Sequence, residues 1–276
     1  MKKIFLFTLT IISVLVMFLG ISNRALAQTV NITDGPLTDA NKLTDPPGAG
    51  QTGDTHDVAT WITKWYGLTG NYTENGGFGT SAPMDLMSIG TGGEITDVSL
   101  STQSGLYKTR NIDVDWGAAH GGARTWTVFT IDPNSGDNMN RGGPANNYDH
   151  YGILVIDAPK NMTSTMSPAH DDHAQIWING EKWYNNSQWT GAVKKVQFNI
   201  EVDLKKGTNV LVYRCGEGGG SGYFNLHFDD ETHNTVKIYP DKATDKDTFF
   251  AEIEGILPVE PLEKLTTIWA DIKRNR

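Results

Sequence analysis

The stretch from residue 170 to residue 230 constrains the fold more than any other part of this chain of 276 residues. Apolar and polar side chains alternate through residues 196–204, which is the period of a strand with one buried face. Two further strand-like runs, residues 174–178 and 181–185, are separated by Asn179-Gly180, a dipeptide that favours a two-residue type I′ hairpin turn. Strands joined by short turns form antiparallel sheets, and such sheets pair face to face. The stretch therefore predicts an antiparallel β-sandwich.

Further strands are predicted on both sides of these runs. A turn at residues 205–209 leads into a strand at 210–215, and a glycine-rich segment, 216–222, precedes a last strand at 223–228. Residues 151–157 are apolar at successive positions, as expected of a central strand buried on both faces. Earlier strands are predicted at residues 61–66, 94–100 and 125–131, with long polar loops at 77–94 and 132–150.

Three motifs follow one another in an order that is known from a group of binding modules. They are Asp171-Asp172 before a strand, Asn179-Gly180 at the end of that strand, and the turn LKKGTN at residues 204–209. In these motifs the chain resembles the second half of PA14-like and galactose-binding-like β-sandwich modules, over about 60 of its 276 residues. The resemblance implies a jelly-roll sandwich, and many of these modules bind carbohydrate on exported bacterial proteins.

Asp171 and Asp172 form the candidate metal site. Paired aspartates bind calcium in the calcium-dependent lectins of the PA14-like families, and the ion holds sugar hydroxyls, so the resemblance implies this role for both residues. Carboxylates and loop carbonyls are the ligands that calcium takes. His173 stands where those families often have glycine, and the sequence indicates no third ligand. The alternative is structural, with both carboxylates accepting hydrogen bonds from nearby amides where the chain enters the strand.

Aromatic and polar side chains supply the predicted sugar-binding surface. Trp and Tyr rings stack on the apolar faces of sugars, while Asn, Arg and His bind hydroxyl groups. A two-residue turn at 179–180 predicts that Trp177 and Tyr184 share the hairpin face opposite Ile176 and Trp183. The alternative for each residue is packing in the core or exposure on a solvated sheet face. The predicted ligand-binding residues are Trp177, Tyr184, Trp189, Arg214, Tyr223, Asn225 and His227.

The N-terminus predicts export. Lys2-Lys3 precede an apolar run at residues 4–19, and Ala25-Leu26-Ala27 is a cleavage pattern, so residues 1–27 are predicted to be a signal peptide. The alternative is a retained transmembrane anchor. No later run reaches the ~18 apolar residues that a membrane span needs. We therefore expect a soluble mature chain that is secreted, in the periplasm or at the cell surface.

Charge and cysteine content exclude several classes of partner and chemistry. The chain carries a formal charge of −9, and loss of Lys2, Lys3 and Arg24 with the signal peptide, which has no acidic residue, gives −12. An acidic chain without a basic cluster argues against nucleic acids and anionic membranes as partners. Cys215 is the only cysteine, so no intramolecular disulfide forms, and a buried, inert thiol is expected.

The predicted organisation has five parts. A signal peptide at 1–27 and an extended leader at 28–56 precede the sandwich at 57–232, a connector at 233–257 and an amphipathic helix at 258–276. The connector includes a predicted short helix at residues 246–254. The last helix has one apolar stripe, which predicts either packing on the sandwich or docking to a protein partner.

The sequence thus predicts an exported, non-catalytic module that binds a glycan or polysaccharide, with calcium as the candidate cofactor. No G-x-S-x-G motif is present, and no pair among the 32 acidic residues stands out as a glycosidase pair. Two alternatives stay open. One is a small glycoside hydrolase or polysaccharide lyase on the same sandwich, and the other is a structural or adhesive surface module with a protein partner.

Overall fold

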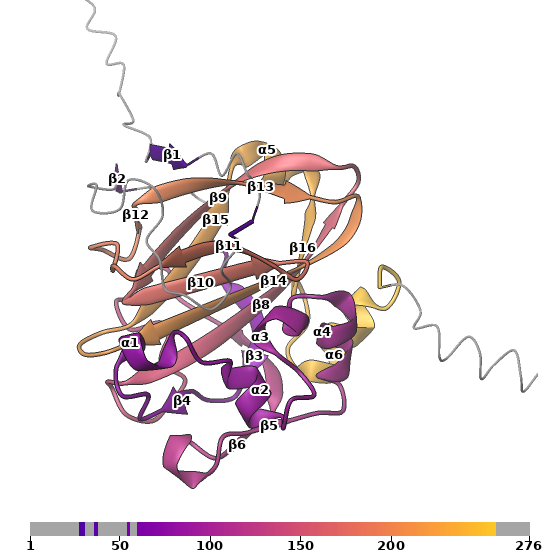
Figure 1. Ribbon diagram of the computed structural model, residues 1–276. Helices are drawn as coiled ribbons and strands as arrows, with labels where there is room; N and C mark the ends of the chain where they lie inside the picture. The colour runs from indigo at the N-terminus through magenta and orange to yellow at the C-terminus, as the bar shows by residue number, and fades with distance from the viewer. Residues whose placement is uncertain (1–27, 31–35, 38–53, 56–59, 258–276) are drawn as a thin grey trace, which may run out of the picture.

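The computed structural model describes residues 28–30, 36–37, 54–55 and 60–257 and has two packed β-sheets with short helices along one side (Figure 1). The predicted signal peptide and the predicted C-terminal helix lie outside the described residues. Strand pairs are antiparallel with one exception, a parallel pair at the start of the described chain. The prediction of an antiparallel β-sandwich is therefore confirmed.

The larger sheet is built around two long paired strands. β8 and β14 pair along eleven residues each, from Tyr148 opposite Glu217 to Ala158 opposite Gly207. β8 includes the segment predicted to be a central strand, and that prediction is confirmed. The sheet runs in the order β11 (Glu181–Asn186), β10 (His173–Ile178), β14 (Gly207–Glu217), β8 (Tyr148–Ala158), β3 (Lys64–Leu68) and β7 (Trp126–Thr130), with β4 (Tyr72–Thr73) and β16 (Lys237–Tyr239) paired to opposite ends of β8.

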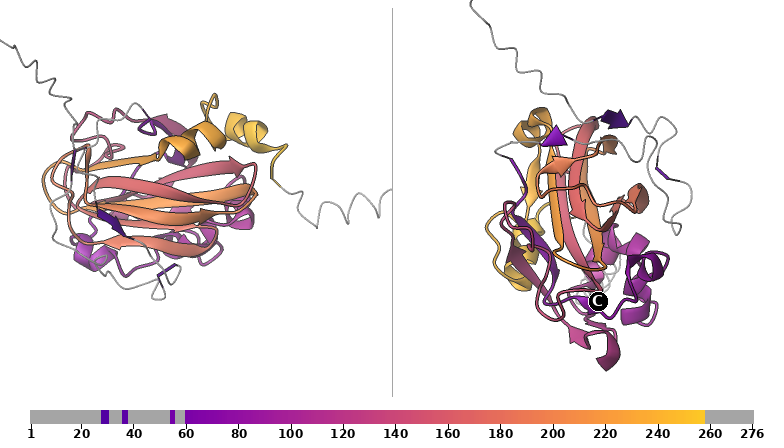
Figure 2. Two further views of the ribbon diagram at one scale, coloured as in Figure 1. Left: turned by 90° about the horizontal axis from the view of Figure 1, so that it is seen from above. Right: turned by 90° about the vertical axis from the view of Figure 1, so that its left-hand side faces the viewer.

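The smaller sheet covers one face of the larger one, and its strands lie side by side in the left view of Figure 2. It runs in the order β1 (Gln28–Val30), β13 (Phe198–Leu204), β9 (Met162–Asp171) and β15 (Tyr223–Phe228). The strands predicted from alternation at 196–204 and at 223–228 are both present. Two short pairs complete the strands: β2 (Asp54–Thr55) with β12 (Lys195–Val196), and β5 (Val114–Asp115) with β6 (Ala123–Arg124).

A first hydrophobic core fills the space between the two sheets. It takes the alternate, inward-facing residues of each strand, because successive side chains in a strand point to opposite faces. In β14 these inward residues are Leu211, Tyr213 and Cys215, all buried. The buried thiol that the sequence predicts at Cys215 is thus observed. In β13 the inward residues are Phe198, Ile200, Val202 and Leu204.

A second core lies on the outer face of the larger sheet, where short helices cover it (Figure 1). The polar loop predicted at 77–94 and the strand predicted at 94–100 are wrong, because these residues form helices. Side chains of Asp85, Thr96 and Thr102 accept hydrogen bonds from backbone amides and cap three of them. The helices are α1 (Phe78–Ser81), α2 (Leu86–Gly90), α3 (Asp97–Leu100) and α4 (Gln103–Lys108), followed by the 3-10 turn η1 (Ala118–His120), α5 (Asp230–Thr235) and α6 (Lys246–Ile253).

The predicted connector contributes to the folded unit. β16 extends the larger sheet by pairing with β8, and α6 packs Phe249, Phe250 and Ile253 into the second core. The short helix predicted at 246–254 is confirmed by α6. Among the described residues no helix is both long enough and apolar enough to cross a membrane.

The hairpin of β10 and β11 has the predicted turn and an unpredicted register. Asn179 and Gly180 have φ values of 54° and 87°, as a two-residue type I′ turn requires. A bulge then shifts the pairing, so that Ile176 lies opposite Tyr184 and not opposite Trp183. One extra residue reverses the face on which later side chains lie. Tyr184 therefore packs in the first core, and the prediction that it shares a face with Trp177 is wrong.

Candidate functional site

Three carboxylates meet where strands of the two sheets end side by side. Asp171 is the last residue of β9, Asp172 links β9 to β10, and Glu217 is the last residue of β14. One oxygen from each carboxylate lies within 4.8 Å of those from the other two. Because β9 belongs to the smaller sheet and β14 to the larger one, this acidic trio spans both sheets. Glu217 supplies the third acidic group that the sequence analysis did not find.

Backbone pairing brings the trio together. His173 pairs with Gly216 in the ladder of β10 and β14, and the amide of Asp172 extends that ladder by donating to the Gly216 carbonyl at 3.0 Å. The Gly218 amide donates to the Asp172 carboxylate at 2.8 Å. The peptide bond between Asp171 and Asp172 is cis. The Asp172 carboxylate thus makes one local hydrogen bond of the structural kind and still lies beside two other acids.

Glu217 is the unusual member of the trio because its side chain is buried. It follows Tyr213 and Cys215 on the inward face of β14, and its residue exposure is 0 %. Neither of its carboxylate oxygens accepts a hydrogen bond of normal geometry from the described residues. A buried carboxylate without a partner is costly, so this group calls for a compensating cation or proton.

Burial and neighbouring negative charge raise the pKa values of Asp171 and Glu217. Burial raises the pKa of Asp171 to about 8, and the charges of Asp172 and Glu217 add to the rise. Burial also raises the pKa of Glu217 to about 7, again with help from Asp172, while the nearby Gly219 amide opposes the shift. Crowded negative charge of this kind favours either protonation or a bound cation.

A buried hydrogen-bond chain fixes the backbone of the trio from behind. His170 Nδ1 lies 2.8 Å from the Asp172 carbonyl oxygen, and its Nε2 lies 2.8 Å from the Tyr184 hydroxyl. A carbonyl only accepts, so Nδ1 carries the proton and Nε2 accepts from Tyr184. Asn186 in turn donates to the Tyr184 hydroxyl at 2.7 Å. Burial lowers the pKa of His170 to about 4, so the ring is neutral and both nitrogens are occupied.

Trp189 is the exposed aromatic residue near the trio. Its side chain is 53 % exposed, and the only other exposed large hydrophobic residue in the described part of the chain is Ile89. The next residue, Thr190, is anchored: its amide donates to the His170 carbonyl at 2.9 Å, and its hydroxyl lies 3.3 Å from the Tyr223 hydroxyl. Tyr223 pairs with Asp171 across β15 and β9, so the loop holds Trp189 at the trio's end of the sandwich.

The remaining predicted ligand-binding residues are not on an open surface. Tyr223 contacts Thr190 as described, and Trp177 lies in the second core, with the Lys182 ammonium 4.6 Å from its ring. Asn225 donates to the carbonyls of Pro133 and Val193, and it accepts a hydrogen bond from Asn138. The prediction of a polar binding face is thus not met here, because packing and internal hydrogen bonds use these side chains. The exposures are 2 % for Trp177, 1 % for Tyr184, 0 % for Arg214, 3 % for Tyr223, 0 % for Asn225 and 6 % for His227.

Arg214 lies on the outer face of β14 and holds the helices to the sheet. Its guanidinium lies 3.2 Å from the Asp149 carboxylate and 3.1 Å from that of Asp97 at the start of α3. It also donates to the carbonyls of Ser81 and Met84 at 2.7 Å each. A guanidinium with four such acceptors has its donors satisfied internally. Arg214 is therefore a structural residue in this arrangement and not a sugar ligand.

Comparison with known proteins found no matching family model, no similar curated protein and no similar solved structure. The resemblance to PA14-like modules accordingly stays a prediction. Function is therefore inferred from the chemistry of the acidic trio and of its neighbours.

Proposed function

We propose that this protein is an exported, non-catalytic carbohydrate-binding module in which Asp171, Asp172 and Glu217 hold a calcium ion beside Trp189. The observation that carries the proposal is the buried Glu217 carboxylate, which accepts no hydrogen bond of normal geometry from the described residues and has an oxygen within 4.8 Å of those of the aspartate pair. A bound calcium ion would supply positive charge and open coordination positions for hydroxyl groups. The Glu217 carboxylate would then have a cation to balance its charge.

The donor set favours calcium among common metal ions. All three candidate side-chain ligands are carboxylates, which hard cations take, while zinc sites use histidine and cysteine. The imidazole of His170, which contacts the Asp172 carbonyl, has both nitrogens in hydrogen bonds and is not available as a ligand. Asp171 and Asp172 are only partly buried, so one side of the trio faces solvent and a ligand has access.

The surroundings favour a neutral, polyhydroxylated ligand. Three acids at one point repel phosphates and other anions, whereas sugar hydroxyls replace water on a bound cation without adding charge. Trp189 offers an exposed ring at the same end of the sandwich, held in place through Thr190. An exposed aromatic side chain with a polar neighbourhood suits the apolar face of a sugar ring.

The hydrolase alternative has less support. Retaining glycosidases place two carboxyl groups about 5–5.5 Å apart across the scissile bond, and inverting ones about 6.5–9.5 Å apart. Here one oxygen from each of three carboxylates lies within 4.8 Å of the others, and such a convergence of three acids suits a shared cation. The adhesive alternative through the C-terminal helix concerns residues outside the described part of the chain.

A glycan array probed with the mature chain, beginning at Gln28, tests the proposal. We expect sugar binding that is strengthened by millimolar calcium and that weakens by about tenfold or more both in a chelator and in the Asp171→Asn/Asp172→Asn variant. Trp189→Ala should weaken binding, while Ile89→Ala, which removes the other large exposed hydrophobic side chain among the described residues, should not. Sugar binding that is indifferent to both calcium and Trp189→Ala would contradict the proposal. Release of reducing sugar that is lost in Glu217→Gln would establish the hydrolase instead.

A further inference from the structure

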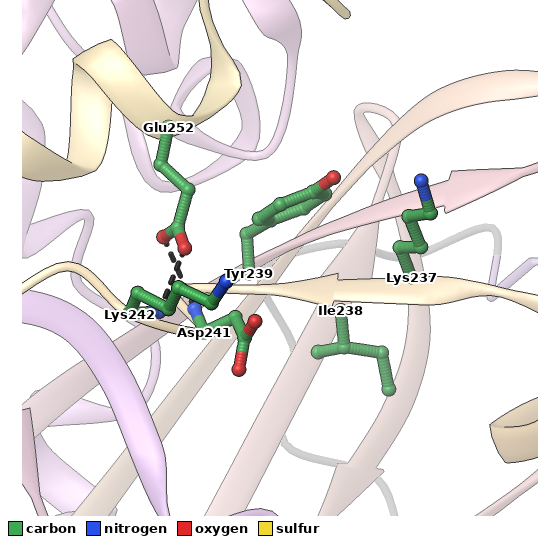
Figure 3. A pocket seen from close by; sticks show the side chains of 6 residues that line it. All are labelled: Lys237, Ile238, Tyr239, Asp241, Lys242 and Glu252. Carbon is green, nitrogen blue, oxygen red and sulfur yellow. Dashed lines mark hydrogen bonds between the residues drawn. The ribbon is translucent and has the colours of Figure 1, made fainter.

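A polar pocket lies at the end of the larger sheet that is far from the acidic trio. It sits between β16 and α6 and has a volume of about 530 Å³ (Figure 3). β16 pairs with β8 at Val155–Asp157, whereas the acidic trio lies beside Tyr148 at the other end of β8. At roughly 3.3 Å per residue along a strand, the two regions are about 25 Å apart. The pocket is lined by Lys237, Ile238, Tyr239, Asp241, Lys242 and Glu252.

Tyr239 gives this pocket an aromatic wall. The ring packs against the second core and is only partly buried, so its orientation is fixed while part of its surface faces the pocket. Lys237 and Tyr239 are alternate residues of β16 and point to the same side, while Ile238 points to the other (Figure 3). The Lys242 side chain approaches Tyr239 from the opposite end of the pocket (Figure 3).

The rim of the pocket is held rigid by hydrogen bonds. The Glu252 carboxylate, on α6, accepts from the amides of Asp241 at 3.1 Å, Lys242 at 2.7 Å and Ala243 at 3.4 Å. Lys64, on β3, donates to the Asp241 carbonyl at 2.5 Å. The loop after β16 is thus tied to both a helix and the sheet. A rigid rim lowers the entropic cost of binding a ligand.

The charges of the pocket balance, and its cations are available. Two lysines, Lys237 and Lys242, stand against two acids, Asp241 and Glu252, which gives no net charge. Within the described part of the chain, neither lysine ammonium makes a hydrogen bond or an ion pair. A pocket with free donors, fixed acceptors and an aromatic wall, but no excess of one sign, suits a neutral ligand rich in hydroxyl groups.

We infer that this pocket is a second carbohydrate-binding site, where a neutral sugar ring stacks on Tyr239 and its hydroxyls bind Lys237, Lys242 and the acidic rim. The class of ligand rests on the proposed function, but the site shares no residue with the acidic trio. Two sites on one rigid domain bind a single polysaccharide chain more tightly than either site alone, through the raised effective concentration of the second contact.

The test compares four forms of the mature chain on immobilised neutral polysaccharides of glucose, galactose, mannose and xylose, with calcium present. The forms are wild type, Asp171→Asn/Asp172→Asn, Tyr239→Ala, and the three changes together. We expect each single-site variant to need about tenfold or more protein for half-saturation, in line with avidity, and the combined variant not to bind. Tyr239→Phe keeps the ring and should bind within about twofold of wild type.

The outcomes separate the two proposals. If the Asp171→Asn/Asp172→Asn variant binds more weakly and Tyr239→Ala binds as wild type does, the second site is overturned and the first stands. If Tyr239→Ala binds more weakly and the aspartate variant binds as wild type does, the second site is supported and the first is overturned. Absence of binding by the wild-type chain overturns both. If Tyr239→Ala does not fold, the exposed pair Lys237→Ala/Lys242→Ala replaces it, and unchanged half-saturation in that pair overturns the second site.

Discussion

Two buried charged residues stand three positions apart on β14 and have opposite surroundings. Arg214, on the outer face, has two carboxylates and two carbonyls within hydrogen-bonding distance. Glu217, on the inner face at the strand's end, accepts no hydrogen bond of normal geometry within the described part of the chain and lies beside two more acids. A buried charge that is satisfied internally supports the fold, whereas one left unsatisfied points to a missing ligand. The comparison separates a structural residue from a proposed cation ligand within a single strand.

The largest expected effect on stability comes from replacing Arg214, the buried charge whose hydrogen bonds are satisfied. Arg214→Met leaves Asp149 and Asp97 buried without their cation, and breaking a buried pair in this way costs about 3–5 kcal/mol. We expect the melting temperature to fall by about 10 °C or more. Thermal and urea unfolding measure the loss. The control is Lys206→Met, which removes an exposed cation. An equal loss of stability in both variants would show that the ion pairs of Arg214 do not stabilise the fold.

Calcium should produce the next largest effect on stability, by binding at the acidic trio. A ligand that binds only the folded chain at 100 times its dissociation constant adds about 2.7 kcal/mol of stability, a rise of roughly 5–10 °C in melting temperature. The rise should disappear in Asp171→Asn/Asp172→Asn. A wild-type melting curve that does not move at millimolar calcium would show that the acids need no cation.

Without calcium, the trio should make stability depend on pH. A carboxyl whose pKa is raised on folding binds its proton more tightly in the folded chain, so its contribution is present at low pH and lost as pH rises. With pKa values of about 8 for Asp171 and about 7 for Glu217, stability should fall between pH 4 and pH 8.

The Glu217→Gln variant sharpens this pH prediction. It removes one charge, so in chelator at pH 8 it should melt about 2–4 °C above wild type, equivalent to ~1 kcal/mol. At pH 4, where Glu217 of the folded chain is protonated, the difference should vanish. The control is Glu201→Gln, a change to an acid of β13 that is outside the trio. A variant less stable than wild type at pH 8 would mean that the Glu217 carboxylate has a partner of its own.

The smallest effect on stability should come from Trp189→Ala. Its side chain is exposed, so the change should alter the free energy of unfolding by no more than ~0.5 kcal/mol. Sugar affinity should nevertheless fall about tenfold or more, as expected for an aromatic anchor at a binding site. Isothermal titration with a sugar from the array measures the affinity, and an unchanged value would remove Trp189 from the site.

Much of the strand arrangement is predictable because it depends on local patterns. Alternation specifies β13, and Asn179-Gly180 specifies the turn after β10. The bulge in β11 is not visible as a pattern, and it is this bulge that moves Tyr184 into the core. The helices between residues 78 and 108 are only four to six residues long, and side chains cap three of the four, so no sustained helical period identifies them.

Of the acidic trio, the sequence predicts the aspartate pair and not Glu217. Asp171-Asp172 is recognisable as a motif, but Glu217 lies 45 residues beyond Asp172 in the chain and joins the pair only through the register of β10 with β14. The signal was present in the alternation of Tyr213, Cys215 and Glu217, which continues the inward face of the strand. Arg214 is an ionic residue in an otherwise apolar run, and such a position is typical of a buried ion pair, which the structure shows with Asp149.

The most direct test of the central claim is a calcium titration of the mature chain by calorimetry at pH 7.5, in wild type and in Glu217→Gln. The account predicts one calcium ion per wild-type chain and an affinity about tenfold or more weaker in the variant, because affinity follows the number of charged ligands. Equal binding by both forms, or no binding by the wild type at millimolar calcium, would contradict the assignment of Glu217 and the aspartate pair to a cation site.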